Sequence, residues 1–261
     1  MAKLRDKLWL WGHPEGRYNS EFGNTEVSRM TPLEGAMMLD CTGIFMVPVG
    51  IDVNRRQYNH SFKPMQRVGW ECYSAATNPE VVEPLIKESG DFDNICCVVF
   101  DDFHRDYAFR NFDIQNLYKV HDRIHNNDVK ELDMWMVLYT HEFGEKPEED
   151  EEFMPFIAPF DGIIMWTWEE KNVANFEEKY KKFKEMTKGK RKMLGLYLYN
   201  FGEEKKATAK AVKWQLERYS ELLKAGEVEG IVLHTNTMAD LDHESYDACM
   251  EWLAVHADDE I

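Results

Sequence analysis

The sequence lacks the long apolar runs that mark membrane proteins and secreted precursors. None of its apolar runs approaches the roughly 20 residues that a helix needs to span a bilayer. The N-terminal stretch MAKLRDKLWLWGH carries basic residues, but its apolar part is too short for the core of a secretory signal. These absences lead us to expect a cytoplasmic protein with no membrane partner.

Cysteine is scarce and follows no pattern of metal binding or disulfide pairing. The chain has 5 cysteines, an odd number, and no CxxC spacing among them. Cys96 and Cys97 are adjacent in an apolar run, so on a strand their side chains would point to opposite faces. We interpret the cysteines as reduced thiols that serve as small apolar residues, which agrees with a reducing compartment.

Positive charge is also in short supply. The 31 lysines and arginines face 48 aspartates and glutamates, which leaves a net charge of −17. Nucleic acids require basic stripes that neutralise phosphates, so this balance argues against a nucleic-acid partner. It argues equally against an anionic membrane surface and against a strongly anionic polymer as substrate.

The sequence does contain short apolar runs, which recur along its whole length and are typical of buried strands. They are LWLWG (8–12), IFMVPV (44–49), RVGWECY (67–73), ICCVVFDD (95–102), DMWMVLYT (133–140), GIIMWTW (162–168), MLGLYLYN (193–200) and GIVLHTN (230–236). Amphipathic stretches that predict helices lie between them, at 31–39, 79–89, 113–126, 149–158, 170–187, 207–225 and 243–256. Residues 51–66 have little periodicity, so we expect an irregular connection there with at most a short helix.

Eight strands with mostly helical connections predict an α/β fold, a single (β/α)₈ TIM barrel with an irregular connection after strand 2. We expect residues 1–261 to form this one barrel domain. The alternative is a doubly wound open sheet, which would favour a glycine-rich phosphate turn after the first strand. Here WGHPEGRYNSEFGN follows that strand and contains no GxGxxG motif.

The active site of such a barrel forms where the strands end, so residues at those positions are candidates. They are rich in aromatic, carboxylate and amide groups and poor in cations, which suits a neutral polyhydroxylated ligand. The stretches after the last two strands, NFGEEKKA and HTNTMADLD, lack a phosphate cradle. We expect these residues to bind the substrate: Trp11, His13, Trp70, Glu71, His141, Trp168, Tyr199, His234 and Asn236.

Carboxylates recur at the ends of three consecutive strands and are candidates for acid–base chemistry. The fourth run ends in Asp101 and Asp102, while Glu142 follows the fifth and Glu169 the sixth. Side-chain alternation predicts that only one member of the aspartate pair faces the pocket squarely. Two close carboxylates would raise one pKa, as a general acid needs. The alternative is that the pair is a solvated strand end or a helix cap.

The acidic VVFDDF, the aromatic-acidic IIMWTWEE and the tyrosine-rich LGLYLYNFG resemble the strand ends of catalytic glycoside hydrolase barrels. The resemblance covers nearly the whole chain. It implies a hydrolase in which Asp102 or Asp101 is one catalytic carboxylate and Glu169 or Glu142 is the other. The sequence has neither the DxxDxDxE motif of chitinase-like barrels nor the strand-four Asn-Glu pair of the large retaining clan.

Two other functions remain compatible with the same residues. One is a metal-dependent sugar isomerase, epimerase or lyase, in which His141, His234, Glu71 and Glu169 would bind a divalent metal. The other is a sugar-binding barrel without catalytic activity. The hydrolase itself is expected to need no metal or other cofactor, and its expected partner is a small carbohydrate. No oligomeric state follows from the sequence.

Overall fold

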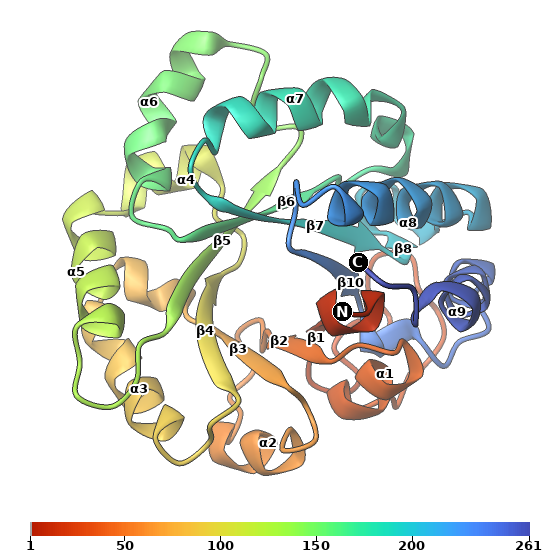
Figure 1. Cartoon of the computed structure of the whole chain (residues 1–261), viewed down its shortest axis with the longest axis horizontal. Coiled ribbons are helices and arrows are strands. Elements are labelled where there is room, and N and C mark those ends of the chain that lie inside the picture. The colour runs from red at the N-terminus through yellow and green to blue at the C-terminus, as the bar shows by residue number, and fades with distance from the viewer. Residues whose placement is uncertain (1) are drawn as a thin grey trace.

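Eight parallel strands close into a barrel in the computed structural model, which describes residues 2–261 (Figure 1). Around the barrel the order is β1, β10, β7, β6, β5, β4, β3 and β2, so that chain neighbours are also neighbours in space. The predicted (β/α)₈ fold is therefore confirmed. The strands are β1 (Leu8–Gly12), β2 (Gly43–Met46), β3 (Arg67–Glu71), β4 (Ile95–Phe100), β5 (Asp133–Tyr139), β6 (Gly162–Trp166), β7 (Arg191–Tyr197) and β10 (Gly230–His234).

Helices surround the barrel and cover the outer faces of its strands (Figure 1). The α-helices are α1 (Pro32–Met38), α2 (Arg55–Ser61), α3 (Glu83–Ser89), α4 (Arg105–Asn111), α5 (Ile114–His125), α6 (Pro147–Ile157), α7 (Phe176–Met186), α8 (Ala209–Lys224) and α9 (Glu244–His256). Short 3₁₀ turns join them, among them η2 (Tyr73–Ala76) and η4 (Glu170–Asn175). A small antiparallel hairpin follows β7. It consists of two strands of two residues each, β8 (Tyr199–Asn200) and β9 (Lys205–Lys206). Among the described residues, no helix is both long and apolar enough to cross a membrane.

Side-chain caps determine where several of these helices begin. The hydroxyl of Thr31 accepts the backbone N–H of Glu34, and the Glu34 carboxylate accepts the N–H of Thr31 at the start of α1. This reciprocal capping box satisfies two donors that a helix otherwise leaves unpaired. Thr208 caps α8 with its hydroxyl alone, which accepts the N–H of Ala211.

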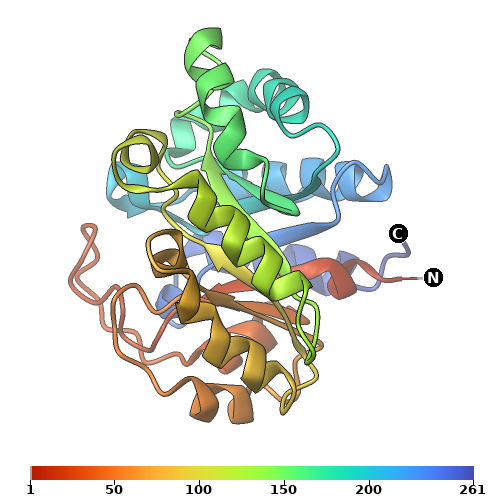
Figure 2. The ribbon, with the colours of Figure 1, turned by 90° about the vertical axis from the view of Figure 1, so that its left-hand side faces the viewer.

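The connection after β2 is irregular, as the sequence indicated. Residues 47–54 form no helix or strand, and the seven-residue α2 follows them. The connection after β1 is longer still: residues 13–31 form turns and bends without a helix. In Figure 2 both termini lie at one end of the barrel, and this long loop lies toward the opposite end.

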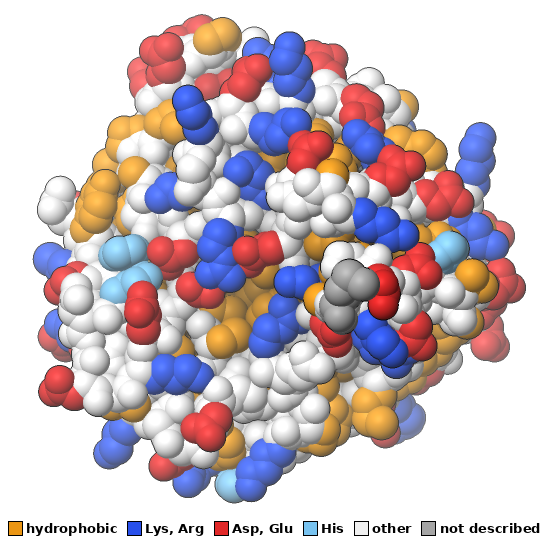
Figure 3. Space-filling model, viewed as in Figure 1, with side chains coloured by type: hydrophobic (Ala, Val, Ile, Leu, Met, Phe, Trp, Pro, Cys, Tyr) orange, Lys and Arg blue, Asp and Glu red, His pale blue; other side chains and the backbone are white. Residues whose placement is uncertain are grey.

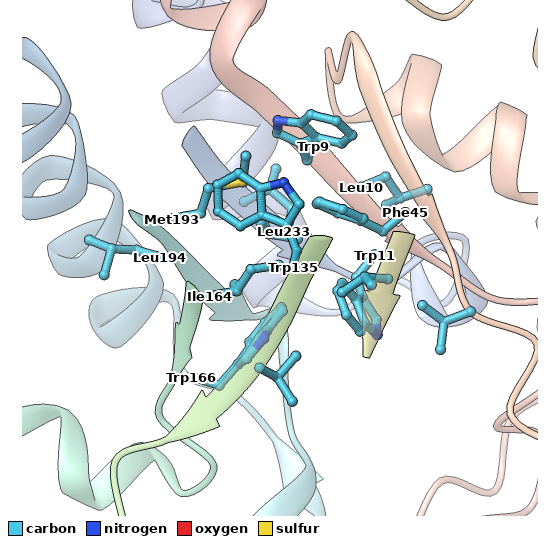
Figure 4. Close-up of a cluster of buried hydrophobic side chains, with 14 of the residues drawn as sticks. Trp9, Leu10, Trp11, Phe45, Trp135, Ile164, Trp166, Met193, Leu194 and Leu233 are labelled. Atoms are coloured by element: carbon cyan, nitrogen blue, oxygen red, sulfur yellow. The ribbon is translucent and has the colours of Figure 1, made fainter. Parts of the chain in front are cut away.

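Tryptophan fills much of the barrel interior. Trp11 on β1 meets Trp166 on β6, with ring centroids 5.5 Å apart, although the two strands are not neighbours. Contact across the barrel requires that both side chains point inward. Trp9 stacks on Phe45 of β2 at 4.4 Å, and Trp135 lies in the same cluster (Figure 4). Large flat side chains therefore form a dry floor inside the barrel.

Glycines on neighbouring strands make room for these rings. Gly43, Gly162 and Gly195 lie directly beside Trp9, Trp135 and Trp166, respectively, in the strand pairings. A methyl group added to Gly195 would lie 2.1 Å from the Trp166 ring, and one added to Gly162 would lie 2.3 Å from the Trp135 ring. Each pair combines the largest residue with the smallest, so that the interior reaches close packing.

Gly195→Ala is expected to destabilise the fold, because the new methyl group would overlap the buried ring of Trp166. Overpacking of this kind costs about 1–3 kcal/mol in the free energy of unfolding. Gly12→Ala is the matched control, since its methyl group would meet its nearest neighbour, Pro32, at 3.2 Å. Urea unfolding of both variants measures the difference. Equal stability of the Gly195 variant and the wild type would contradict this account of the interior.

Candidate active site

Two connected hollows form the mouth of the barrel, at the carboxyl ends of the strands. The larger is a cavity of about 600 Å³, and the smaller, of about 100 Å³, lies over the aromatic floor. Val49, Asp101 and Asp102 line both of them. The aspartate pair therefore occupies the junction of the two hollows, which we call the mouth cavity.

Strand register explains why two carboxyl groups from neighbouring strands face the mouth cavity together. Glu71 at the end of β3 pairs laterally with Val99 of β4. Asp101 lies two residues beyond Val99, and alternate residues of a strand share a face. Glu71 and Asp101 consequently point to the same side of the barrel wall, and both line the larger cavity.

Asp102 also lines the cavity, which strand alternation alone would forbid. Its φ angle is +46°, in the left-handed region that aspartate tolerates better than most residues. This turn ends the strand and brings the side chain of Asp102 back toward the cavity. Its backbone N–H donates to Oδ1 of Asp101 at 2.8 Å. The expectation that only one of the two faces the pocket is corrected here, because the chain leaves the extended conformation after Asp101.

The mouth cavity favours a neutral carboxyl group at Asp101. One edge of this side chain reaches the cavity while the barrel wall encloses the rest, and this burial raises the pKa of Asp101 well above its usual range. The negative charge of Asp102 raises that pKa further, and that of Glu71 adds a smaller effect. Burial also raises the pKa of Glu71, and Asp102 contributes to that rise.

Asp102 is held by groups from the next strand. The hydroxyl of Tyr139, at the end of β5, donates to Oδ1 of Asp102 at 2.9 Å. The ring of His104 stacks on that of Tyr139, and its Nε2 lies 3.7 Å from the same carboxylate oxygen. Nδ1 of His104 contacts Oε1 of Glu142 at 2.9 Å. A relay of carboxylate, imidazole and carboxylate thus runs outward from the cavity.

Glu142 takes a supporting position in this relay. Its hydrogen bond with His104 is the main cause of the raised pKa of that imidazole. Arg105 donates to the backbone carbonyl of Glu142 at 3.0 Å. Glu142 and His141 line a separate hollow of about 100 Å³ outside the mouth cavity. Neither residue lines the mouth cavity, but both contact residues that do: Glu142 bonds to His104, and the ring of His141 stacks on that of Tyr139.

The structure does not bring Glu169 to the mouth cavity. Its carboxylate accepts Nζ of Lys171 at 3.1 Å and the side-chain amide of Asn172 at 2.9 Å. The chain turns into η4 immediately after this residue, which directs the carboxylate toward that 3₁₀ turn. The sequence expectation of a strand-six carboxylate opposite Asp101 is corrected by this local turn.

Aromatic side chains wall the smaller hollow. Trp11 and Trp168, both expected to bind substrate, line it together with Trp166, Tyr139 and Tyr197. Trp70 does not, because it alternates with Glu71 on β3 and faces the helices. There it is buried, and its indole N–H donates to Asn59 of α2 at 2.9 Å.

Two buried histidines lie beneath this aromatic wall. Nε2 of His13 lies 3.2 Å from Nε2 of His234, and Nδ1 of His13 donates to the carbonyl of Val47 at 2.7 Å. Burial lowers the pKa of His13 to about 3 and also lowers that of His234. Both imidazoles are therefore neutral. His234 lines the smaller hollow, whereas His13 supports it from below.

Asn236 and Tyr199 hold the long loop after β1 in place. The amide of Asn236 accepts the N–H of His13 at 2.8 Å and donates to the carbonyls of His13 and Met30 at 3.0 and 2.8 Å. The hydroxyl of Tyr199 donates to the carbonyl of Phe22 at 2.8 Å. Both residues were expected to bind the ligand, but their polar groups form hydrogen bonds with the loop instead.

That loop supplies residues that sequence reasoning missed. Tyr18 and Arg17 both line the smaller hollow, and Arg17 is the one lysine or arginine among the described residues that line the two hollows. Tyr139 and Tyr197 were also left out of the residues expected to bind substrate, although they occupy inward positions at the ends of β5 and β7. Alternation counted back from the strand ends could have identified these two tyrosines, but it gives no signal for the loop residues.

The proposed ligands of the metal alternative do not converge. His141 lies beside the outer hollow, Glu169 pairs with Lys171, and His234 is buried against His13. Only Glu71 and His234 of that set line the mouth cavity. The geometry of the described mouth residues instead offers acid–base chemistry from carboxyl groups between aromatic walls, with little positive charge.

Comparisons with known proteins identify the fold. No known family profile matches the sequence, and no curated protein matches it. Among solved structures, a xylanase-α-amylase inhibitor protein (XAIP-III) has a TM-score of 0.56 at 10% identity and covers 94% of this chain and 98% of its own. GH26C from Muricauda sp. has a TM-score of 0.53 at 11% identity, with 98% of this chain and 89% of that chain covered.

Tryptophan synthase from M. tuberculosis is also similar, with a TM-score of 0.51 at 13% identity over 98% of this chain and 94% of that chain. At such identities the likeness shows the shared barrel fold. The architectural resemblance to glycoside-hydrolase-like barrels is thereby confirmed, without assigning the chain to one family.

The raised pKa of Asp101 predicts that Asp101→Asn stabilises the protein at pH 7. In the unfolded chain this carboxyl loses its proton near pH 3.9, whereas the folded protein keeps the proton to higher pH, so stability falls as the pH rises through that window. Asparagine is neutral throughout and can still accept the N–H of Asp102.

The gain in the free energy of unfolding of Asp101→Asn over the wild type should therefore appear at pH 7 and vanish below about pH 4. Denaturant unfolding of both proteins at the two pH values measures it. Asp128→Asn, an exposed site between α5 and β5, is the control and should show no such gain. A variant no more stable than the wild type at pH 7 would show that Asp101 is not buried as a neutral acid.

Proposed function

We propose that the protein is a glycoside hydrolase that acts on a neutral sugar or a short oligosaccharide. The observation that carries the proposal is the pairing of a half-buried carboxyl group of raised pKa, Asp101, with the exposed side chain of Asp102 at an aromatic-lined barrel mouth. Two carboxyl groups in different protonation states are what hydrolysis of a glycosidic bond requires.

Asp101 is the general acid in this proposal. Its raised pKa lets the carboxyl group keep its proton to higher pH than an ordinary aspartate, and the group would deliver that proton to the oxygen of the departing group as the bond breaks. Asp102 is the second carboxyl group, which would stabilise positive charge on the sugar ring or activate the attacking water molecule. The hydroxyl of Tyr139 orients Asp102 by donating to its Oδ1.

Glu71 completes the acidic wall of the larger hollow. It lies on the same face as Asp101, and its charge contributes to the raised pKa of that residue. We assign it to the binding of sugar hydroxyls, for which a carboxyl group can both accept and donate. Its removal should lower the pKa of Asp101 and so move the basic limb of the pH–activity profile to lower pH.

The walls of the mouth cavity suit a sugar. Trp168 and Tyr197 meet edge to face at 5.6 Å and line the smaller hollow, where aromatic surfaces can pack against the C–H faces of a pyranose ring. A cavity of about 600 Å³ is within the range of small-molecule sites. The proposal needs no metal or cofactor. GH26C, which shares the fold, bears a glycoside hydrolase designation in its name.

A sugar-binding barrel without catalytic activity is the second candidate. The structural neighbour XAIP-III is described as an inhibitor protein, and one fold often hosts both enzymes and binding proteins. The two candidates differ in one respect: the binding protein would retain its ligand without converting it.

Hydrolysis of a panel of aryl glycosides, with and without EDTA, tests the proposal. We expect turnover that EDTA leaves unchanged. Asp102→Asn should lower kcat/KM by about 10²–10⁴-fold, the usual contribution of a positioned acid or base, and Asp101→Asn should do so on the substrates whose leaving group needs protonation. Asp128→Asn is the matched control and should keep wild-type activity. Full activity in both site variants would contradict the proposal, and binding without turnover would favour the second candidate.

Leaving-group dependence separates the two aspartates. A dinitrophenyl group departs without protonation, whereas an alkyl alcohol needs a proton from the acid. Asp101→Asn should therefore lose most of its activity on alkyl glycosides and little of it on dinitrophenyl glycosides. Asp102→Asn should lose activity on both. Initial rates on the two substrate classes provide the comparison, and an equal loss of activity in both variants on both classes would refute the assignment of roles.

A further inference from the structure

A second cluster of ligating side chains lies at the opposite end of the barrel from the mouth cavity. His121 and His125 are one turn apart on α5, and Asp161 immediately precedes β6. One atom from each of the three lies within 4.8 Å of those of the other two, which no other group of three such residues achieves among residues 2–261. Figure 3 shows histidine side chains beside acidic ones at the left of the view, where Figure 1 places α5.

The hydrogen bonds of His125 leave one nitrogen aimed at Asp161. Nδ1 of His125 contacts the backbone carbonyl of His121 at 2.8 Å and must donate to it, because a carbonyl can only accept. In a neutral imidazole, Nε2 then carries a lone pair. That Nε2 lies 3.2 Å from Oδ2 of Asp161. Two lone pairs at this distance repel each other unless a proton or a metal cation lies between them.

His121 adds a second nitrogen to the same position. Its ring stacks on that of His125 with centroids 3.9 Å apart, and its Nε2 lies 3.6 Å from Oδ1 of Asp161. Stacked imidazoles that share one carboxylate favour a single cation held by all three groups over protons on both rings.

Hydrogen bonds already hold the side chain and the backbone of Asp161 in a position to bind a cation. Its Oδ2 accepts the backbone N–H of Met134 at 2.7 Å, and its backbone bonds to Met134 and Arg191 on the two adjacent strands. A carboxylate anchored by other hydrogen bonds loses little freedom when it binds a metal. The positive charge of Lys190 lies nearby and would oppose the binding of a cation. Its ammonium group, however, donates to the backbone carbonyl of Ala158 at 2.6 Å.

We propose that His121, His125 and Asp161 form a site for a divalent transition-metal ion, with Zn²⁺ as the preferred ion. Two imidazoles and one carboxylate are a ligand set typical of zinc. Glu131, whose Oε1 lies 3.8 Å from Nε2 of His125, can supply the fourth ligand. The ion links α5 to the start of β6, at the barrel end where groups serve stability. The inference is independent of the proposed hydrolase activity.

Zinc titration of the full-length protein tests the site, with isothermal calorimetry and a competing chromophoric chelator as readouts. We expect one equivalent to bind, together with a rise in Tm. His121→Gln and His125→Gln should each weaken binding at least about tenfold, since even outer-shell changes cost 10–100-fold. His60→Gln, at an exposed histidine of α2, is the matched control and should bind zinc as the wild type does.

The wild-type protein alone supplies an independent check if a variant fails to fold. Zinc should shift the nitrogen resonances of His121 and His125 in long-range ¹⁵N spectra, while that of His60 stays in place. Cobalt should give the spectrum of nitrogen and oxygen ligands, with no thiolate charge-transfer band. Failure of zinc to saturate, or binding that survives both histidine substitutions, would overturn the proposal. A protein that hydrolyses no glycoside but binds zinc at these residues would still support the metal site.

Discussion

The alternation of side chains along eight closed parallel strands is the constraint from which the rest of this structure follows. Every second residue points into the barrel, so the interior must be filled layer by layer. Trp9, Trp135 and Trp166 fill the lower layers, and each lies beside a strand glycine that leaves room for its ring. The next inward positions, at the carboxyl ends of the strands, are Glu71, Asp101 and Tyr139. The same alternation therefore builds both the dry interior and the acidic mouth.

The interior gives the mouth its chemistry. Asp101 borders the smaller hollow together with Trp11 and Trp166, so water reaches it from the cavity side alone. In such surroundings the charged form of a carboxyl group is disfavoured, and the charge of Asp102 disfavours it further. The left-handed backbone of Asp102 turns its side chain toward the larger hollow instead. One change in backbone direction thus gives two adjacent carboxyl groups different surroundings.

Much of this arrangement could be predicted from the sequence, and the exceptions have identifiable physical causes. Each of the eight apolar runs forms a strand, because a fully buried parallel strand needs a continuous apolar run. Asp101 and Asp102 were located at the mouth by the same reasoning. The direction of Glu169 depends on η4, and that of Asp102 depends on a positive φ; neither leaves a periodic trace in the sequence. Asn236 and Tyr199 were misjudged because their partners, His13 and Phe22, lie about 200 residues away in the chain.

The central claim is that burial raises the pKa of Asp101 well above its usual range and that the charge of Asp102 raises it further. A ¹³C NMR titration of the aspartate carboxyl groups, in the wild type and in Asp102→Asn, measures this most directly. The account predicts that the Asp101 carboxyl resonance of the wild type titrates well above about pH 4 and that the resonance in the variant titrates at a lower pH than in the wild type. An Asp101 that titrates near pH 4 in both proteins, as a free aspartate does, would contradict the account.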